Sequence, residues 1–233
     1  SVGFGGGSSY LAILSLVLTD FYEIRSTALI LNIFVVTIGT LVFIKNGVLK
    51  LKLIWPFFVL SIPLAYLGAV IKLSQTTFFL ILGGALVMAG FFMILKFLQN
   101  KIQTQEFSNP KKIILGGSIG LLSGISGIGG GIFLSPVLHL LNWANPRIIA
   151  SLASIFILVN SLAGLIGLNM AGTFHVNYDL IVKLIVAVVF GGSLGSYLSN
   201  KRFNLKFLGF LTAMLILYVG LRLVLSHGFD IHV

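Results

Sequence analysis

The 233-residue sequence contains no cysteine and only five acidic residues. The absence of cysteine excludes disulfides, thiol chemistry and cysteine-based metal sites. Charged residues of both signs make up only 9% of the chain, whereas hydrophobic residues make up 58%. A soluble domain has to cover its surface with polar groups, so this composition indicates a protein that resides in a membrane.

Long apolar stretches recur along the chain, and examples are "STALILNIFVVTIGTLVFI" and "LIWPFFVLSIPLAYLGAVI". They approach the roughly 20 residues that a helix needs to cross about 30 Å of hydrocarbon. The sequence therefore predicts an all-α membrane protein, a polytopic helical bundle. We expect short helices at 8–19, 113–126 and 132–142, and longer spans at 26–44, 53–71, 76–98, 147–169, 178–199 and 205–225.

The two halves of the sequence resemble each other, which predicts a two-copy architecture. Gly3-Phe4-Gly5-Gly6-Gly7 matches Gly127-Ile128-Gly129-Gly130-Gly131, and further matches follow in order, such as Ala28 with Ala150 and Leu53 with Leu180. We predict a first repeat at 1–98, a basic cytoplasmic linker at 99–112 and a second repeat at 113–233. The chain does not begin with Met, and we expect the first repeat to lack its N-terminal short helix.

Each copy is predicted to cross the membrane an odd number of times, because its two short helices return the chain to one side before three full spans follow. The copies then have inverted topologies. The basic residues support this parity, since most fall on one side, which the positive-inside rule makes cytoplasmic. The net charge of +10 thus reports orientation rather than nucleic-acid binding. The predicted cytoplasmic loops of this multi-pass membrane protein are 45–52, 99–112, 143–147 and 200–206.

The triple glycines are predicted to break a helix inside the membrane. Such a break leaves backbone groups unpaired, which hydrocarbon tolerates only beside a water-filled or ligand-filled cavity. Glycine reaches positive φ and lets a ligand approach the backbone, and the helix that follows presents free N–H groups that attract anions. Two such ends facing each other near the midplane are typical of a secondary transporter.

Glycine also has a simpler role in membrane helices, which is close packing. We assign packing to Gly83, Gly84, Gly90, Gly191, Gly192 and Gly195, and it remains the alternative for the triple glycines. A soluble nucleotide-binding loop would need a strand before the glycines and a βαβ unit around them.

Polar residues near the breaks and inside the spans complete the predicted anion site, because their hydroxyl and amide groups can donate hydrogen bonds. Helix-to-helix hydrogen bonds are the alternative role for each of them. The candidate substrate-binding residues are Gly5, Gly6, Gly7, Ser8, Ser9, Asn32, Gly129, Gly130, Gly131, Ser135, Ser154 and Asn160.

Titratable residues in the spans are few. Arg25 and Arg147 begin equivalent spans, where each either attracts anions from its own side or extends to the lipid headgroups. His139 is the one histidine that we place within a membrane segment, and it is a candidate for proton coupling,. An interfacial histidine without a proton role is the alternative.

At these residues the chain resembles the TauE/SafE sulfite exporter family, also called the sulfonate uptake permease family. The resemblance rests on "GFGGGSSYLAIL", "GLLSGISGIGGGIFLSPVLHLL" and "NPRIIASLASIFILVNSLAGLIG". The first copy departs from the family pattern at Ala12, which stands where the second copy has Pro136. The resemblance implies a bacterial inner-membrane transporter of sulfite, organosulfonates or related small anions, driven by ion gradients.

Two transport mechanisms fit these observations, an alternating-access carrier and an anion channel that uses the same helix ends. A membrane enzyme or scaffold fits poorly, because the sequence has no paired carboxylates and no metal-ligand cluster. We therefore predict no enzymatic activity, no cofactor and no metal. The expected partners are a small anionic substrate, a coupling proton or other ion, and the lipid bilayer, with no nucleic acid.

Overall fold

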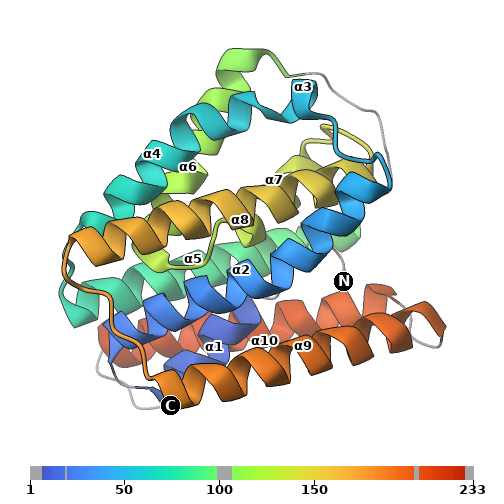
Figure 1. Cartoon of the computed structure of the whole chain (residues 1–233). Coiled ribbons are helices and arrows are strands. Elements are labelled where there is room, and N and C mark those ends of the chain that lie inside the picture. Colours follow the sequence, from blue (N-terminus) through green and yellow to red (C-terminus); the bar gives the residue numbers. More distant parts are fainter. Residues whose placement is uncertain (1–6, 19, 99–106, 202–204, 229–233) are drawn as a thin grey trace.

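The chain folds into a bundle of helices, as the computed structural model shows (Figure 1). The structure describes residues 7–18, 20–98, 107–201 and 205–228. Within these ranges all regular structure is helical. The helices are α1 (Gly7–Val17), α2 (Phe21–Lys45), α3 (Leu51–Ile54), α4 (Pro56–Val70), α5 (Gln75–Leu98), α6 (Asn109–Ser126), α7 (Gly131–Leu140), α8 (Pro146–Met170), α9 (Tyr178–Lys201) and α10 (Leu205–Gly228).

The predicted helices are present, with three corrections to their bounds. The span predicted at 53–71 is divided between α3 and α4, because Pro56 begins a new helix after Trp55. The predicted linker 99–112 overlaps α6, which begins at Asn109 with a proline in its first turn. Finally, α2 begins at Phe21 rather than near residue 26. Its N-cap is Asp20, whose side chain accepts a hydrogen bond from the backbone N–H of Tyr22,.

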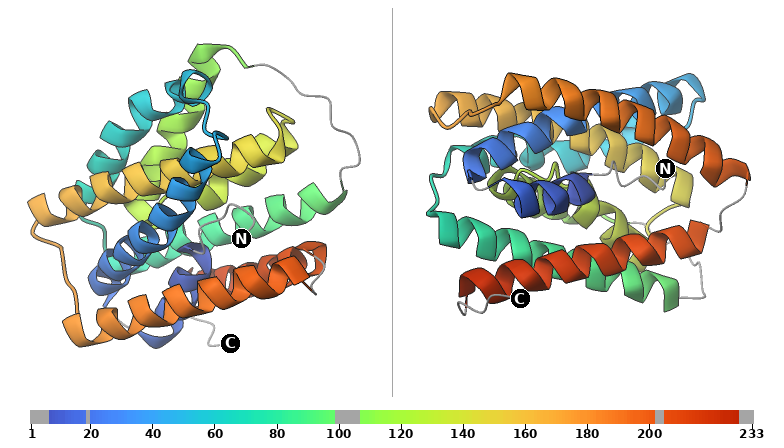
Figure 2. Two further views of the ribbon diagram at one scale, coloured as in Figure 1. Left: turned by 45° about the vertical axis from the view of Figure 1, so that its right-hand side comes forward. Right: turned by 90° about the horizontal axis from the view of Figure 1, so that it is seen from below.

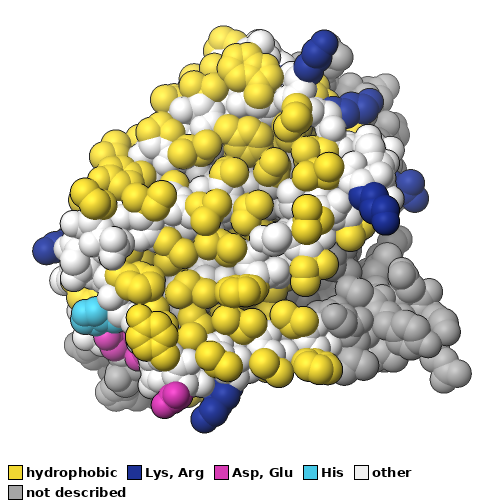
Figure 3. Space-filling model, in the orientation of Figure 1, with side chains coloured by type: hydrophobic (Ala, Val, Ile, Leu, Met, Phe, Trp, Pro, Cys, Tyr) yellow, Lys and Arg dark blue, Asp and Glu magenta, His cyan; other side chains and the backbone are white. Residues whose placement is uncertain are grey.

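The surface suits a lipid bilayer. Among the residues that the structure describes, three helical segments are long and apolar enough to cross a membrane, namely Phe21–Lys45, Gln75–Leu95 and Pro146–Met170. Figure 3 shows a face covered with hydrophobic side chains, with most of the visible Lys and Arg at one end and the visible Asp, Glu and His towards the other. Exposed large apolar residues over so wide an area mark a lipid-facing surface.

Helices α4 and α6 pack in parallel along their lengths at close range (Figure 1). A Cβ added at Gly116, Gly120 or Gly124 would overlap the backbone of Phe57, Ser61 or Ala65 in turn. Glycine at every fourth position therefore lets the two backbones approach. The contact is a packing feature built from glycines on one helix face.

The other main contacts join helices from the two halves of the chain. Helix α5 packs on α10, α2 packs on α8 (Figure 2), and both α4 with α8 and α2 with α9 are further neighbours. Gly83 and Gly220 lie at the α5–α10 contact, where a Cβ on either would lie 2.9 Å from the other's carbonyl oxygen. Packing is thus confirmed for Gly83, and also for Gly90, which contacts Leu217. At Gly84 and Gly191 an added Cβ would meet no described atom within 4 Å, so among the described residues neither glycine is needed for close packing; the side-chain surroundings of Gly192 and Gly195 lie outside the described residues.

Helices α6 and α7 bring the chain back to the end of the bundle from which α6 starts. Lys112, in the first turn of α6, lies over the ring of Trp143, which follows α7, at 5.9 Å from its centroid. Trp143 also packs edge-on against Phe57 at the start of α4. At the opposite end, the loop after α8 meets the start of α2, where His175 Nδ1 lies 3.2 Å from Asp20 Oδ2.

Candidate functional site

The second triple-glycine segment forms the break between α6 and α7. Gly127 is the C-cap of α6 with φ of +72°, and Gly129 and Gly130 have φ of +80° and +81°. Gly130 is the N-cap of α7, and its carbonyl accepts from the N–H groups of Phe133 and Leu134. Three left-handed residues in four positions require glycine. Ahead of these two bonds, the N–H groups of Gly131 and Ile132 at the start of α7 have no acceptor within the helix,.

Side chains of α2 and α8 surround this break. A Cβ at Gly129 would lie 2.9 Å from both Asn32 Nδ2 and Ser161 Oγ, and 2.8 Å from Ile157. A Cβ at Gly131 would overlap Ile157. The glycines therefore serve close packing as well as backbone conformation, and they bring Asn32 and Ser161 to the same point of the backbone.

The two predicted asparagines are buried, and each donates to a backbone carbonyl. Asn32 Nδ2 donates to the carbonyl of Ile128 at 3.0 Å, and Asn160 Nδ2 donates to that of Phe156 at 2.8 Å. These carbonyls fix the orientation of the amides, because a flipped amide would place two oxygens together. Neither Oδ1 atom has a hydrogen-bond partner among the described residues. Each amide therefore keeps an unpaired oxygen, and Asn32 keeps it beside the break.

The predicted serines divide into two kinds. Ser154 bonds across helices, donating to the carbonyl of Val36 and lying 3.0 Å from the hydroxyl of Thr40, so it fastens α8 to α2. Ser135, in α7, is fully buried, and its Oγ has no partner among the described residues. Ser135 therefore retains the hydrogen-bonding capacity expected of a ligand contact.

Ser161 is a site residue that the sequence did not predict. It is fully buried, it lies at Gly129, and its hydroxyl has no partner within the described ranges. Its one signal in the sequence is its position directly after Asn160, but a helix turns about 100° between neighbours. Only the packing of α8 on the break shows which of the two faces Gly129.

Most of the first glycine cluster cannot be compared with the second. Gly5 and Gly6 lie outside the described residues. Gly7, Ser8 and Ser9 form the start of α1, and the surroundings of their side chains lie outside the description. Helix α1 packs on α2 and α10 and touches α7. The helices that follow the two glycine clusters are thus neighbours.

Of the three titratable residues singled out in the sequence, Arg25 departs from its expected position. Arg25 is not a helix-end arginine that extends to the headgroups, because α2 begins at Phe21 and Arg25 is only 1% exposed. Arg147 is exposed in the first turn of α8. His139 is half-buried in the last turn of α7. It is eight residues from Gly131, or about 12 Å along the helix, so it lies away from the break.

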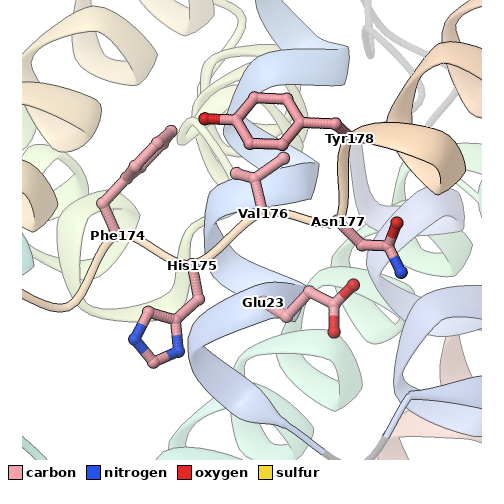
Figure 4. A pocket seen from close by; sticks show the side chains of 6 residues that line it. All are labelled: Glu23, Phe174, His175, Val176, Asn177 and Tyr178. Atoms are coloured by element: carbon pink, nitrogen blue, oxygen red, sulfur yellow. The ribbon is translucent and has the colours of Figure 1, made fainter.

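An open cavity of about 490 Å³ lies at the start of α2. Figure 4 shows its lining, which comes from α2, from the loop between α8 and α9, and from the first residue of α9: Glu23, Phe174, His175, Val176, Asn177 and Tyr178. One carboxylate oxygen of Glu23 is buried with no described partner. A carboxylate repels an anion, so this cavity disfavours an anion, whereas the N–H groups of the break favour one.

No group of three or more His, Cys, Asp or Glu side chains that could hold a metal ion occurs in the part of the chain that the structure describes.

A family model and two relatives match nearly the whole length of the chain. The family model described as "Sulfite exporter TauE/SafE" matches residues 1–223. A protein of Sinorhizobium fredii, named "Probable membrane transporter protein y4hK", is 31% identical over 228 residues, which cover 96% of this chain and 92% of that protein. "Probable membrane transporter protein YunE" of Bacillus subtilis is 24% identical, with 96% and 91% covered. No solved structure matches significantly. The chain therefore belongs to the TauE/SafE sulfite exporter family, and it is a multi-pass bacterial membrane protein of a transporter family.

Proposed function

We propose that this protein is a secondary transporter of small anions, with sulfite or an organosulfonate as the substrate. The observation that carries the proposal is the buried break at Gly127–Gly130, where α7 begins beside Asn32 and Ser161, with Ser135 about one turn further into α7. The N–H groups at the start of α7 and its dipole favour a negative charge. The unpaired hydroxyls of the two serines add donors.

The proposed substrate has oxygen atoms that accept hydrogen bonds, since the break offers backbone N–H and hydroxyl groups. Sulfite and sulfonates have three such oxygens around one sulfur. The family description names sulfite, and the named relatives are described only as probable membrane transporters. We place the substrate at the break rather than in the cavity at Glu23, because Glu23 carries the same sign of charge as the substrate.

The proposed mechanism is alternating access between two inverted repeats. It is supported by the way helices contact one another: α2 packs on its predicted counterpart α8, and α5 packs on its predicted counterpart α10. The contact of α4 with α8 is mirrored by that of α9 with α2, and the contact of α5 with α7 by that of α10 with α1. Such paired contacts suit two units that rock against each other about a central site.

The test is uptake by proteoliposomes of sulfite, sulfoacetate, taurine and a matched carboxylate, with and without an imposed pH gradient. We expect saturable uptake of a sulfur oxyanion and counterflow, in which internal unlabelled substrate drives the entry of labelled substrate. A channel gives conductance without counterflow. If correctly folded protein moves no anion in either condition, the proposal is wrong.

A further inference from the structure

Arg25 is the most deeply buried cationic side chain in the described part of the chain, at 1% exposure. It lies one turn into α2. Its Nη2 donates to the carbonyl of Gly124 at 2.9 Å and to that of Ala69 at 3.3 Å. Its guanidinium carbon lies 5.9 Å from the centroid of the Phe78 ring. The charged group is therefore enclosed by α4, α5 and α6.

The guanidinium has more donors than its surroundings use. Its Nε and Nη1 atoms are buried, and neither has a hydrogen-bond partner among the described residues. Within the same residues no carboxylate forms an ion pair with it. Glu23 lies two positions away on the same helix, a spacing at which side chains do not face each other. Because a buried charge is costly unless it is paired, this position favours the arrival of an anion.

Arg25 also lies at the glycine break. A Cβ at Gly127 would be 3.1 to 3.3 Å from the Cα, Cβ and Cγ atoms of Arg25, so its stem packs on the first residue of the break. Four residues further on, at most about 14 Å away along an extended chain, α7 begins at Gly131. The stem of Arg25 and the start of α7 thus lie at the two ends of one short segment, and the guanidinium extends from that stem to the last turn of α6 at Gly124.

The carbonyls of Gly124 and Ala69 orient the guanidinium. They belong to the last turns of α6 and α4, where helix dipoles place partial negative charge and favour a cation,. One nitrogen, Nη2, is enough for both contacts. The remaining two nitrogens are left for a ligand, which is more than a simple helix cap needs.

We propose that Arg25 is a substrate-binding residue, which supplies the positive charge for the transported anion and donates hydrogen bonds from Nε and Nη1 to its oxygen atoms. This inference rests on the proposed function, because it assigns a contact within the same site. It limits the substrate class to anions with at least one oxygen acceptor. A neutral analogue of the same shape is excluded.

The charge and the shape of the guanidinium make separate contributions, and two substitutions separate them. Arg25→Lys keeps the charge and one donor for Gly124, but a lysine cannot reach two carbonyls and an oxyanion with fixed geometry. Arg25→Gln keeps a donor and removes the charge. Arg147→Gln is the matched control, because Arg147 begins the equivalent helix and is exposed.

The experiment measures sulfoacetate and sulfite uptake by these variants in proteoliposomes, together with the rise in unfolding temperature that each anion causes in detergent. We expect Arg25→Lys to raise KM by about tenfold to a hundredfold, the size of a lost charged hydrogen bond. Arg25→Gln loses both uptake and the anion-dependent rise, while Arg147→Gln matches the wild type. Should Arg25→Gln fail to fold, Arg25→Lys alone decides.

Two results would overturn the inference, and only one of them would also overturn the proposed function. If the wild type transports and Arg25→Lys retains its KM and its anion-dependent rise, Arg25 is only a helix cap and the proposed function stands. If the folded wild type transports no anion, the proposed function fails and the inference fails with it.

Discussion

Asn32 of α2 donates a hydrogen bond from Nδ2 to the carbonyl of Ile128, 3.0 Å away and 96 residues further along the chain. Ile128 lies between the left-handed glycines 127 and 129, where its carbonyl is outside the regular bonding of α6 and α7. The bond therefore satisfies a buried carbonyl that the break creates. It also joins the first half of the chain to the break in the second half.

Replacing Asn32 with alanine should destabilise the protein. The Ile128 carbonyl would remain buried without a partner, at a cost of about 1–3 kcal/mol. For a chain of this size, that lowers the unfolding temperature by roughly 2–4 °C per kcal/mol. Thermal unfolding in detergent measures the change. Asn46→Ala, an exposed position just after α2, is the control, and equal midpoints for the two variants would contradict the role of the bond.

Replacing Gly124 with alanine should separate α4 from α6. The new Cβ would overlap the carbonyl of Ala65, which is backbone and cannot rotate away. Overpacking of this kind costs about 1–3 kcal/mol or more, so we expect a lower unfolding temperature and a smaller yield of monodisperse protein. Gly84→Ala is the control, since its Cβ would meet no described atom within 4 Å. A Gly124→Ala protein as stable as Gly84→Ala would show that the contact is looser than described.

The hydroxyls of Thr40 and Ser154, 3.0 Å apart, should couple α2 to α8. Hydrogen bonds between membrane helices contribute about 0.6 kcal/mol on average and up to about 1.7. A double-mutant cycle of Thr40→Ala and Ser154→Ala, measured by thermal or denaturant unfolding, should give a coupling energy in this range. Additive effects of the two substitutions would mean that the bond contributes nothing.

The orientation of the bundle can be tested cleanly because the chain has no native cysteine. Lys50 lies in a predicted cytoplasmic loop, and Asp179 lies at the start of α9, at the other end. We expect a membrane-impermeant thiol reagent added to intact cells to label Asp179→Cys and not Lys50→Cys. Everted membrane vesicles should give the reverse, and the same labelling of both positions from one side would reject the predicted topology.

His139 should be dispensable for coupling to a pH gradient. It lies in the last turn of α7, about 12 Å from the break,. We therefore expect His139→Ala to retain uptake driven by a pH gradient, with the proton carried by the substrate itself. Uptake at matched pH without a gradient is the control. Loss of the gradient-driven part alone would identify His139 as the coupling residue.

Most of the fold could be predicted from hydrophobic stretches and glycines, because membrane helices have few alternatives. The residues at which individual helices begin and end could not be predicted in the same way. Pro56 lies within a continuous apolar run, so the separation of α3 from α4 produces no change in hydropathy. Asp20 has the polarity of a loop residue, which hides its role as the cap of α2. The predicted start of the span near residue 26 therefore placed Arg25 at a helix end.

The candidate site was predicted in part. The glycine break is local, and its residues stand next to one another in the sequence. The contacts of Arg25 with Gly124 and of Ser161 with Gly129 depend on how distant helices pack, which periodicity does not encode. The polar residues could be identified as buried candidates, but their unpaired atoms could not. Ser154, for example, is bonded between helices, whereas Ser135 is not paired with any described group.

The most direct test of the central claim, that the anion binds at the break, compares transport by Gly129→Ala and Gly172→Ala. Both positions have positive φ, at +80° and +66°, but only at Gly129 would the new Cβ crowd Asn32 and Ser161. We predict that Gly129→Ala raises KM for the sulfur oxyanion by roughly tenfold or more, equivalent to about 1.4 kcal/mol, while Gly172→Ala retains the wild-type KM. Folded Gly129→Ala protein with an unchanged KM would contradict the account.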